Sequence, residues 1–385
     1  MELLDHWLLS SDTHIVEPPD LFTSRMSKRF LPEAPHTELH DGYECWFLEG
    51  RPITRVGVPF RAGDRFKVAA DRPLRLDFAT GVEASGYVAS EWLRVNEGDG
   101  VYGGIVFPSV SMIMYAVPST ELLDDILRAF NGWIRDFADT DPARIKPIGM
   151  VNVDDPVDAA RRVEDLAGKG FAGALIPVAP PSERPYSLPE YEPLWAAAAA
   201  SSMPLHLHVV TDRNPGRYGH TTLRAALKVN DPDYHVRLAL TDMVFNGVFE
   251  RHPELRVVSV EHEGGWLRHW LARMDWHYRY NLSLTETRLK DSALPSDFVA
   301  QSVYVSFSDD QVLVADRDAI GVDHLLWGSD YPHSESTFPK SRQYAAAQVD
   351  GLSPEDRKKI TQLNTAELYG FEVPSAPPPK PTVAG

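Results

Sequence analysis

The sequence predicts a (β/α)8 barrel, an α/β fold in which eight parallel strands alternate with helices around one core. Three observations predict it. Eight short apolar runs occur along the chain, and nearly all are followed by a segment with apolar residues at helical spacing. The length of 385 residues accommodates eight such units. The rival fold, a doubly wound open sheet, usually carries a phosphate-binding loop, and neither GxGxxG nor GxxxxGK(S/T) occurs here.

The predicted strands are short, and several end where polar residues or proline interrupt the apolar run. The first strand includes Leu8 and Leu9, runs into a polar cluster and stops before Pro18, because proline cannot donate a hydrogen bond to a neighbouring strand. The second apolar run is closed in the same way by Pro108. The eight strands are placed at about residues 8, 104, 146, 172, 204, 256, 303 and 325.

Between the strands, apolar residues recur at the three- and four-residue intervals of a helix. Segment 119–139 shows this pattern. Segment 156–169 follows Asp154–Asp155, which favour a helix start, and ends at Gly170. Consecutive alanines favour a helix over 192–202. We expect further helices over 242–251, 266–280, 311–320 and 354–369.

Two segments fall outside this alternation. Residues 38–100 contain two short strands joined at Glu49–Gly50, a hairpin signal. We interpret 38–100 as an insertion after the first strand, folded over the barrel, where it would shape a lid or an interface. Residues 373–385 form a proline-rich tail that we expect to be disordered. The chain is therefore predicted to be a single domain over 1–372.

Composition excludes several classes of function. With 38 Lys+Arg against 55 Asp+Glu, the net charge of -17 disfavours binding to nucleic acid or to an anionic membrane surface. Cys45 is the only cysteine, which excludes an intrachain disulfide and CxxC zinc sites. The amino terminus resembles no signal peptide, and no run of eighteen apolar residues occurs. We therefore expect a cytoplasmic protein.

Ionisable residues gather where four of the predicted strands end. In a barrel these carboxyl ends form the active-site face. Asp12 and His14 lie two residues apart, so they point to the same side of their strand. A hydrogen-bonded Asp–His pair would explain them alone, and a lone strand-end histidine is more often structural. The convergence of several strand ends favours a metal ion, whose ligands would be Asp12, His14, His208 and Asp330.

Four motifs carry a resemblance to a known family. They are D-x-H-x-x-E-P at 12–18, P-L-x-L-H at 204–208, H-x-G-G at 262–265 and W-G-S-D-Y-P-H at 327–333. In this order, over roughly residues 8 to 370, the chain resembles the amidohydrolase superfamily. The most similar branch is amidohydrolase-related family 2, which includes aminocarboxymuconate semialdehyde decarboxylase and resorcylate-type decarboxylases.

The resemblance implies a role for each matching position. The pair Asp12–His14 and His208 would hold a divalent metal, Zn²⁺ in the first place and Mn²⁺ as the alternative. Asp330 would bind the metal or take a proton from water, and His262 would act as acid and base. Asp12 stands where the family has histidine or glutamate. Four further residues are expected either to hydrogen-bond to the metal ligands or to contact the substrate: Glu17, Glu263, Trp266 and His333.

Two reactions use this apparatus. The family branch favours non-oxidative decarboxylation of an aromatic or conjugated carboxylic acid. The alternative is attack by metal hydroxide on a C–N, C–O or C–C bond of a small cyclic or amide substrate. A metal-free binding barrel is a third possibility. The partner is expected to be a small molecule, and the family resemblance suggests a homodimer. Aromatic candidates for a pocket wall, which core packing explains equally well, are Trp46, Trp266, Trp327 and Tyr331.

Overall fold

The fold is a (β/α)8 barrel, seen in a computed structural model that describes residues 3–57, 60–68, 77–213, 232–281, 289 and 293–378. Within these residues the larger sheet has eight strands in the order β1-β5-β6-β7-β8-β9-β10-β11. This arrangement confirms the eight predicted βα units. The strands are β1 Leu8–His14, β5 Val101–Phe107, β6 Ile145–Met150, β7 Gly173–Ala179, β8 Leu205–Asp212, β9 Val257–Val260, β10 Val303–Phe307 and β11 Leu325–Trp327.

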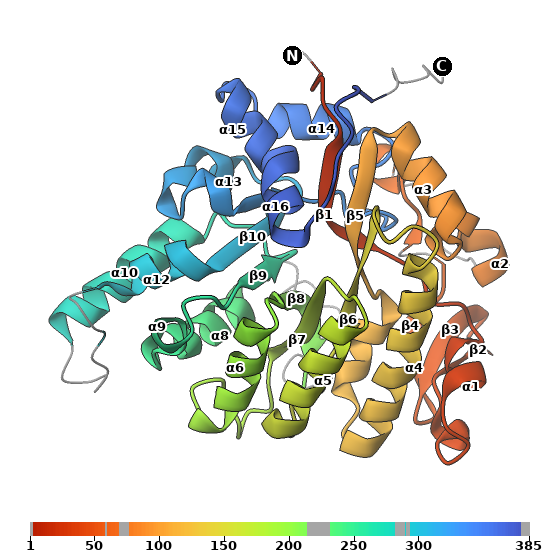
Figure 1. Cartoon of the computed structure of the whole chain (residues 1–385). Helices are drawn as coiled ribbons and strands as arrows, with labels where there is room; N and C mark the ends of the chain where they lie inside the picture. The colour runs from red at the N-terminus through yellow and green to blue at the C-terminus, as the bar shows by residue number, and fades with distance from the viewer. Residues whose placement is uncertain are drawn as a thin grey trace. The chain divides into compact units, whose positions relative to one another are not determined.

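The chain divides into two compact units: β1, β5 and β6 lie in unit 1, β7 to β10 lie in unit 2, and β11 is divided between them after Leu326. Unit 1 comprises residues 1–114, 119–150 and 327–385, and unit 2 comprises 115–118 and 151–326. In unit 1, β1 pairs in parallel with β5, and β5 with β6 (Figure 1). The chain that follows β11 forms a parallel bridge to β1 between Thr13 and Tyr331, both in unit 1.

Helices of unit 1 cover the outer faces of its strands. Helix α3 packs on β5, α4 on β6 and α16 on β1. Every residue of β1 is buried, including its polar ones, as is usual for a parallel strand covered on both faces. The helices are α1 Leu21–Arg25, α2 Phe78–Gly81, α3 Ala89–Gly98, α4 Thr120–Ala138, α14 Ser341–Gln348, α15 Pro354–Lys358 and α16 Asn364–Tyr369.

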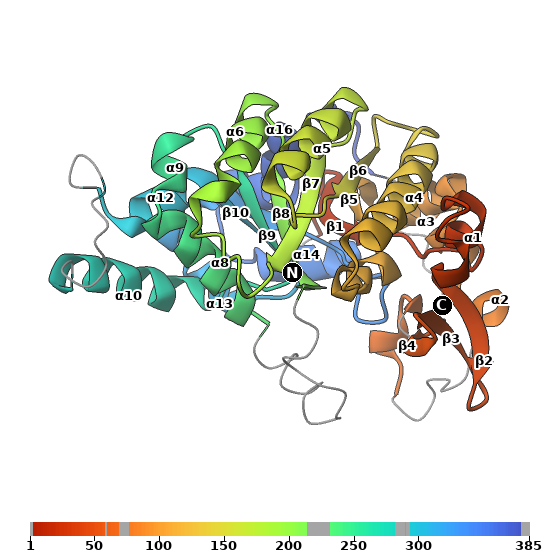
Figure 2. The ribbon, with the colours of Figure 1, turned by 90° about the horizontal axis from the view of Figure 1, so that it is seen from below.

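The 38–100 segment contains the predicted hairpin. Strands β3 Tyr43–Leu48 and β4 Arg51–Arg55 pair antiparallel across Glu49–Gly50. A third strand that the sequence did not indicate, β2 His36–His40, pairs with β3. Figure 2 shows this small sheet beside α1, and Phe22 of α1 meets Trp46 of β3 edge to face at 5.9 Å between ring centroids.

In unit 2, β7, β8, β9 and β10 pair in parallel in that order. Helix α5 starts as predicted, because the Asp155 side chain accepts hydrogen bonds from the first-turn amides of Val157 and Asp158. The helices are α5 Pro156–Gly168, α6 Glu192–Ala200, α8 Tyr234–Phe245, α9 Val248–Arg251, α10 Leu267–Tyr280, α12 Pro295–Ser302 and α13 Gln311–Ala315.

Three predicted helices differ in their bounds. The helix expected over 311–320 ends at Ala315, as α13, and a 3₁₀ turn over Arg317–Ala319 follows it. The helix expected over 242–251 starts earlier, as α8, and is interrupted by Gly247, whose positive φ of 68° separates α8 from α9. The helix expected over 354–369 is interrupted by a π-helical turn at Lys359–Leu363 between α15 and α16. Of the predicted tail, residues 379–385 lie outside the described part of the chain.

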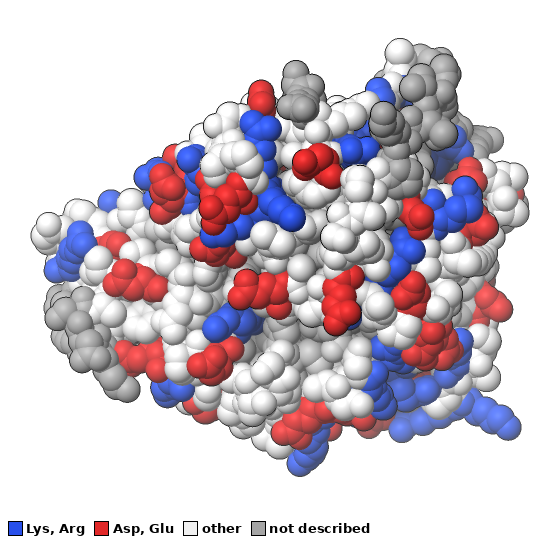
Figure 3. All heavy atoms as spheres, turned by 45° about the horizontal axis from the view of Figure 1, so that its top comes forward, with Lys and Arg blue, Asp and Glu red and all other residues white. Residues whose placement is uncertain are grey.

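Charged side chains of both signs lie interspersed over the face shown in Figure 3. None of the helices within the described residues has the length and apolarity needed to cross a membrane.

Candidate metal centre

The carboxyl end of β1 places a carboxylate against an imidazole inside unit 1. Asp12 and His14 point to the same side of the strand, and Asp12 Oδ1 lies 3.2 Å from His14 Nε2. Their exposed fractions are 4% and 0%. Burial of both groups side by side costs free energy unless each is satisfied by a partner or by a bound ion.

The chain after β11 brings a second carboxylate to the same imidazole. The Asp330 amide donates to the Asp12 carbonyl oxygen at 2.9 Å, and the His14 amide donates to the Tyr331 carbonyl at 2.6 Å. These bonds fix Asp330 Oδ1 at 3.4 Å from His14 Nε2. Asp330 adopts a φ of 58°, a left-handed conformation that costs a non-glycine residue on the order of 1 kcal/mol. Strain of this kind is retained at functional sites.

The hydrogen bond on the far side of His14 determines which ring nitrogen carries the proton. His14 Nδ1 lies 2.7 Å from the carbonyl oxygen of Pro108, which can only accept, so Nδ1 donates. In the neutral ring, Nε2 then presents its lone pair to two carboxylate oxygens. Complete burial, and next the neighbouring His333, lower the pKa of His14 from 6.5, which favours the neutral ring.

A lone pair that faces two anionic oxygens is a repulsive arrangement unless a cation lies among them. Histidines that bind metals donate their other ring N–H to a carbonyl or carboxylate in just this way. The donor set of Asp12, His14 and Asp330 therefore suits a divalent metal ion. His14, Asp330 and His333 also form a group whose ligand atoms lie within 4.8 Å of one another, which is close enough to bind one ion.

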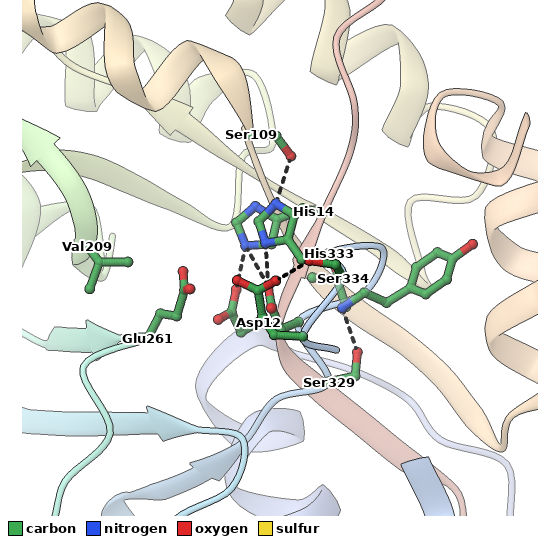
Figure 4. Close-up of polar contacts among 12 residues, drawn as sticks. Asp12, His14, Ser109, Val209, Glu261, Ser329, His333 and Ser334 are labelled. Atoms are coloured by element: carbon green, nitrogen blue, oxygen red, sulfur yellow. Dashed lines mark hydrogen bonds and ion pairs between the residues drawn. The ribbon is translucent and has the colours of Figure 1, made fainter. Parts of the chain in front are cut away.

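His333 and Glu17 lie beside these groups in unit 1. His333 Nδ1 is 2.7 Å from Asp330 Oδ1, and its ring stacks on that of His14 with centroids 4.0 Å apart (Figure 4). The Glu17 carboxylate, fully buried, accepts hydrogen bonds from the amides of Ser109, Val110 and Ser111. Glu17 therefore anchors the loop that follows β5.

In unit 2, β8 carries His206 and His208 on the same face, both fully buried. His208 Nδ1 lies 3.1 Å from the Val209 carbonyl oxygen, and His208 Nε2 lies 3.5 Å from Glu261 Oε2. The imidazole of His208 thus repeats the arrangement of His14, with a carbonyl at one nitrogen and a carboxylate at the other. His206 lies two residues before His208. A Cβ atom on Gly173 of the neighbouring strand β7 would lie 2.2 Å from the His206 ring, so the ring packs against the β7 backbone.

Residues after β9 form the second polar group of unit 2. His262 is buried, and its Nδ1 lies 3.2 Å from the Ser259 hydroxyl. The Trp266 indole donates to the His262 carbonyl at 3.1 Å, so Trp266 supports this turn. Burial, and next the charge of Asp310, raise the pKa of Glu263 to about 7. Glu261 and Glu263 both adopt positive φ, at 61° and 50°.

The structure brings the predicted residues Asp12, His14, Asp330 and His333 together in unit 1. In unit 2, it places His208 beside Glu261, and His262 and Glu263 follow Glu261 directly in the chain. Sequence reasoning assigned no role to Ser109, Glu261 or Asp310. Ser109 and Glu261 each lie just after the carboxyl end of a strand, and this position was the sequence feature that could have indicated a role at the site. Three of the aromatic candidates, Trp46, Trp327 and Tyr331, are buried in the core.

A (β/α)8 barrel whose strand ends carry buried imidazoles and carboxylates is the framework of a barrel enzyme with a candidate metal centre. A family model described as "Amidohydrolase" matches residues 115–371. The chain belongs to the amidohydrolase family and is an enzyme of that family, which confirms the resemblance drawn from the four motifs.

Curated and solved relatives agree with this assignment. Gamma-resorcylate decarboxylase of Rhizobium sp. (strain MTP-10005) is 25% identical over 279 residues, covering 67% of this chain and 80% of that protein. The solved structure of an amidohydrolase from Mycobacterium avium subsp. paratuberculosis K-10 covers 95% of this chain and 100% of its own, with a TM-score of 0.76 and 22% identity.

Two further solved structures are decarboxylases of hydroxylated benzoates. The 2,6-dihydroxybenzoate decarboxylase from Rhizobium has a TM-score of 0.62 and 16% identity, and the match covers 95% of this chain and 99% of that one. The dihydroxybenzoic acid decarboxylase from Polaromonas sp. JS666 contains bound manganese and the inhibitor 2-nitroresorcinol. It has a TM-score of 0.63 and 17% identity, with coverage of 95% and 97%. At these identities the likeness shows the fold.

Proposed function

We propose that this protein is a metal-dependent decarboxylase that removes CO₂ from an aromatic or conjugated carboxylic acid without an oxidant. The observation that carries the proposal is the lone pair of His14 Nε2 facing Asp12 and Asp330, because a divalent cation turns this repulsive arrangement into a ligand set. The resorcylate decarboxylase relative directs the proposal towards decarboxylation.

The proposed ligands are Asp12, His14 and Asp330 of unit 1 and His208 of unit 2. His208 is included because the carboxyl ends of all eight strands of a (β/α)8 barrel open on one face. Two imidazoles and two carboxylates suit Zn²⁺, and the carboxylates also suit Mn²⁺. Manganese in the Polaromonas enzyme makes Mn²⁺ a strong rival to Zn²⁺. Metal content of the purified protein, followed by reconstitution with each ion, distinguishes the two.

In the proposed reaction the bond between the ring carbon and the carboxylate carbon breaks. The electron pair stays on the ring carbon, which takes up a proton, so that the acid becomes CO₂ and the same ring with hydrogen in place of the carboxylate. When bound, the metal supplies a Lewis acid that holds a substrate oxygen. His262 is proposed to transfer the proton, and Asp330 to hold or return a proton at its carboxylate oxygen.

Hydrolysis is the second candidate, favoured by the family description and by the amidohydrolase from Mycobacterium avium subsp. paratuberculosis K-10. Asp330 would then take a proton from the attacking water, and His262 would protonate the leaving group. If the protein is instead a metal-free binding barrel, it should catalyse neither reaction and should contain no stoichiometric metal.

The deciding experiment measures CO₂ release and water-dependent cleavage with the same metal-loaded protein. The acids are hydroxylated benzoates, including 2,6-dihydroxybenzoate, and the rival panel contains amides and lactones of similar size. We expect CO₂ release from at least one acid. Cleavage of an amide or lactone, with no CO₂ from any acid, would replace the proposal by hydrolysis.

The remaining proposals concern assembly and location. We propose a homodimer that acts on a small molecule in the cytoplasm and binds neither nucleic acid nor membrane. Light scattering on the eluting protein tests the dimer, and cell fractionation tests the location.

A further inference from the structure

His333 lies between Asp330 and Ser109 in unit 1, and Figure 4 shows it below Ser109. Its Nδ1 is 2.7 Å from Asp330 Oδ1, and its Nε2 is 3.2 Å from the Ser109 hydroxyl. An ionised carboxylate can only accept a hydrogen bond, so Nδ1 of His333 carries the proton and donates a hydrogen bond to Asp330. Nε2 of the neutral ring then accepts from the Ser109 hydroxyl. Asp330 thereby fixes the tautomer of His333, and the Ser109 hydroxyl, which can donate to Nε2, holds the ring in this orientation.

Ser109 is itself held by the end of the first strand. Its amide donates to Glu17 Oε1 at 3.1 Å, and the two following amides donate to the same carboxylate at 3.0 and 2.8 Å. Glu17 is fully buried, so these three bonds fix the loop after β5. A continuous set of hydrogen bonds therefore leads from Glu17, through the Ser109 backbone and hydroxyl, to His333 and Asp330.

The stacking of His333 on His14 argues against His333 as a ligand of the same ion. The two rings are 4.0 Å apart with 29° between their planes. The lone pair of an imidazole nitrogen lies in the ring plane, and a bound metal sits about 2.0–2.1 Å from that nitrogen. Stacked rings direct the lone pairs of their nitrogens along separate planes. Both nitrogens of His333 also have other partners, Asp330 at Nδ1 and Ser109 at Nε2, so His333 would orient a ligand and not act as one.

We infer that His333, oriented by Ser109, is a positioning residue that aims the Asp330 carboxylate at the metal. The inference rests on the proposed function, because it assigns Asp330 to the metal. It also assigns a role to the histidine that ends the W-G-S-D-Y-P-H motif. His333 donates from Nδ1 to the carboxylate three residues before it.

Two substitutions separate positioning from ligation. His333→Asn keeps an amide N–H near the Nδ1 position, whereas His333→Gln places its amide near Nε2 and removes that donor. In competition with a fluorescent chelator, we expect His333→Asn to bind Mn²⁺ within about threefold of the unaltered protein. We expect His333→Gln to bind it about 10–100-fold more weakly, the usual effect of losing a group that orients a ligand.

The difference between the two variants decides the inference. Equal weakening of Mn²⁺ binding in both variants, or no weakening in either, would overturn the positioning role. Ser109→Ala and Ser109→Thr form a second pair if His333→Gln does not fold, and here the hydroxyl of threonine should restore binding that alanine weakens. If Ser109→Thr binds Mn²⁺ no more tightly than Ser109→Ala, this result would also contradict the inference.

A spectroscopic readout adds a test that a merely structural role would not affect. With saturating Co²⁺, the visible spectrum should shift in His333→Gln and stay unchanged in His333→Asn, because only the first variant releases the carboxylate. Identical spectra in both variants would contradict the inference. None of these measurements uses a substrate, so they stand apart from CO₂ release. Absence of any metal binding by the unaltered protein would overturn the proposed function and the inference together.

Discussion

A Cβ atom placed on Gly328 would lie 2.7 Å from the Cβ of Asp12 and 3.1 Å from its backbone nitrogen. Gly328 thus lets the chain after β11 pass close enough to β1 for Asp330 to reach His14. We expect Gly328→Ala to separate the two segments by a fraction of an ångström. It should lower the free energy of unfolding by about 1–3 kcal/mol and weaken metal binding, as measured by denaturation and chelator competition.

Gly98→Ala is the matched control for this substitution. Gly98 ends helix α3, and a Cβ there would meet nothing within 4 Å. Alanine at this position should leave stability unchanged or raise it by up to about 1 kcal/mol. Equal metal affinity in Gly328→Ala and Gly98→Ala would contradict the role given to the close passage.

Replacement of the buried Glu17 carboxylate should destabilise the fold without direct contact with the metal. In Glu17→Gln, one of the two side-chain oxygens becomes an NH₂ group that confronts a backbone N–H donor. We expect the free energy of unfolding in urea to fall by about 2–3 kcal/mol. Glu164→Gln, on the exposed side of α5, should change it by less than about 0.5 kcal/mol. A similar small effect at both positions would show that the three amides find other acceptors.

The barrel could be predicted from the sequence because strand burial and helix spacing are local patterns. All eight strands lie at apolar runs of the sequence, and several of these runs end in proline or polar residues. The helices α2, α3, α12 and α14 and the strand β2 were not predicted. In β2 the burial is weak, with half-buried and exposed residues only, so no alternation marked it. The division of the 242–251 helix depends on the positive φ of Gly247, which a glycine permits and does not require.

The site was predictable only in part. Asp12 and His14 share a strand face by their spacing alone, and Asp330 followed from a motif. The contact of Ser109 with His333 joins residues 224 positions apart, and it depends on the loop that Glu17 holds. No local pattern encodes such a contact. Glu261 was passed over because its neighbour His262 carried the motif.

Asp99 should make stability depend on pH. Burial raises the pKa of Asp99 to about 7, against the opposing hydrogen bond from Ser341 and the charge of Arg342. The unfolded chain ionises this carboxyl near its ordinary value of 3.8, whereas the folded chain keeps it protonated up to about 7. The folded state is therefore favoured below about pH 4, and this contribution is lost as pH rises towards 7.

Asp99→Asn should remove this loss, because asparagine can accept from the Ser341 amide without a charge. At pH 7.5 we expect the variant to be more stable by on the order of 4 kcal/mol, since the pKa of Asp99 is raised by about three units and each unit corresponds to about 1.4 kcal/mol. Near pH 4 the two proteins should be alike. Thermal unfolding between pH 4 and 8 measures the difference, and parallel curves for the two proteins would disprove it.

His262→Ala should separate proton transfer from metal binding. In unit 2 His262 is held through Nδ1 by the Ser259 hydroxyl, and no ligand role is assigned to it. We expect His262→Ala to lower kcat by about 10²–10⁴-fold, the range for loss of a general acid or base. The metal content, measured by elemental analysis, should stay at that of the unaltered protein.

His14→Ala provides the opposite pattern. It removes the imidazole whose Nε2 faces Asp12 and Asp330, so the two carboxylates lose the nitrogen that shares their ion. Metal content should then fall with activity, and excess metal in the assay should restore part of the activity. The same restoration in His262→Ala would identify His262 as a ligand, because added metal compensates for weak binding and cannot replace a missing proton donor.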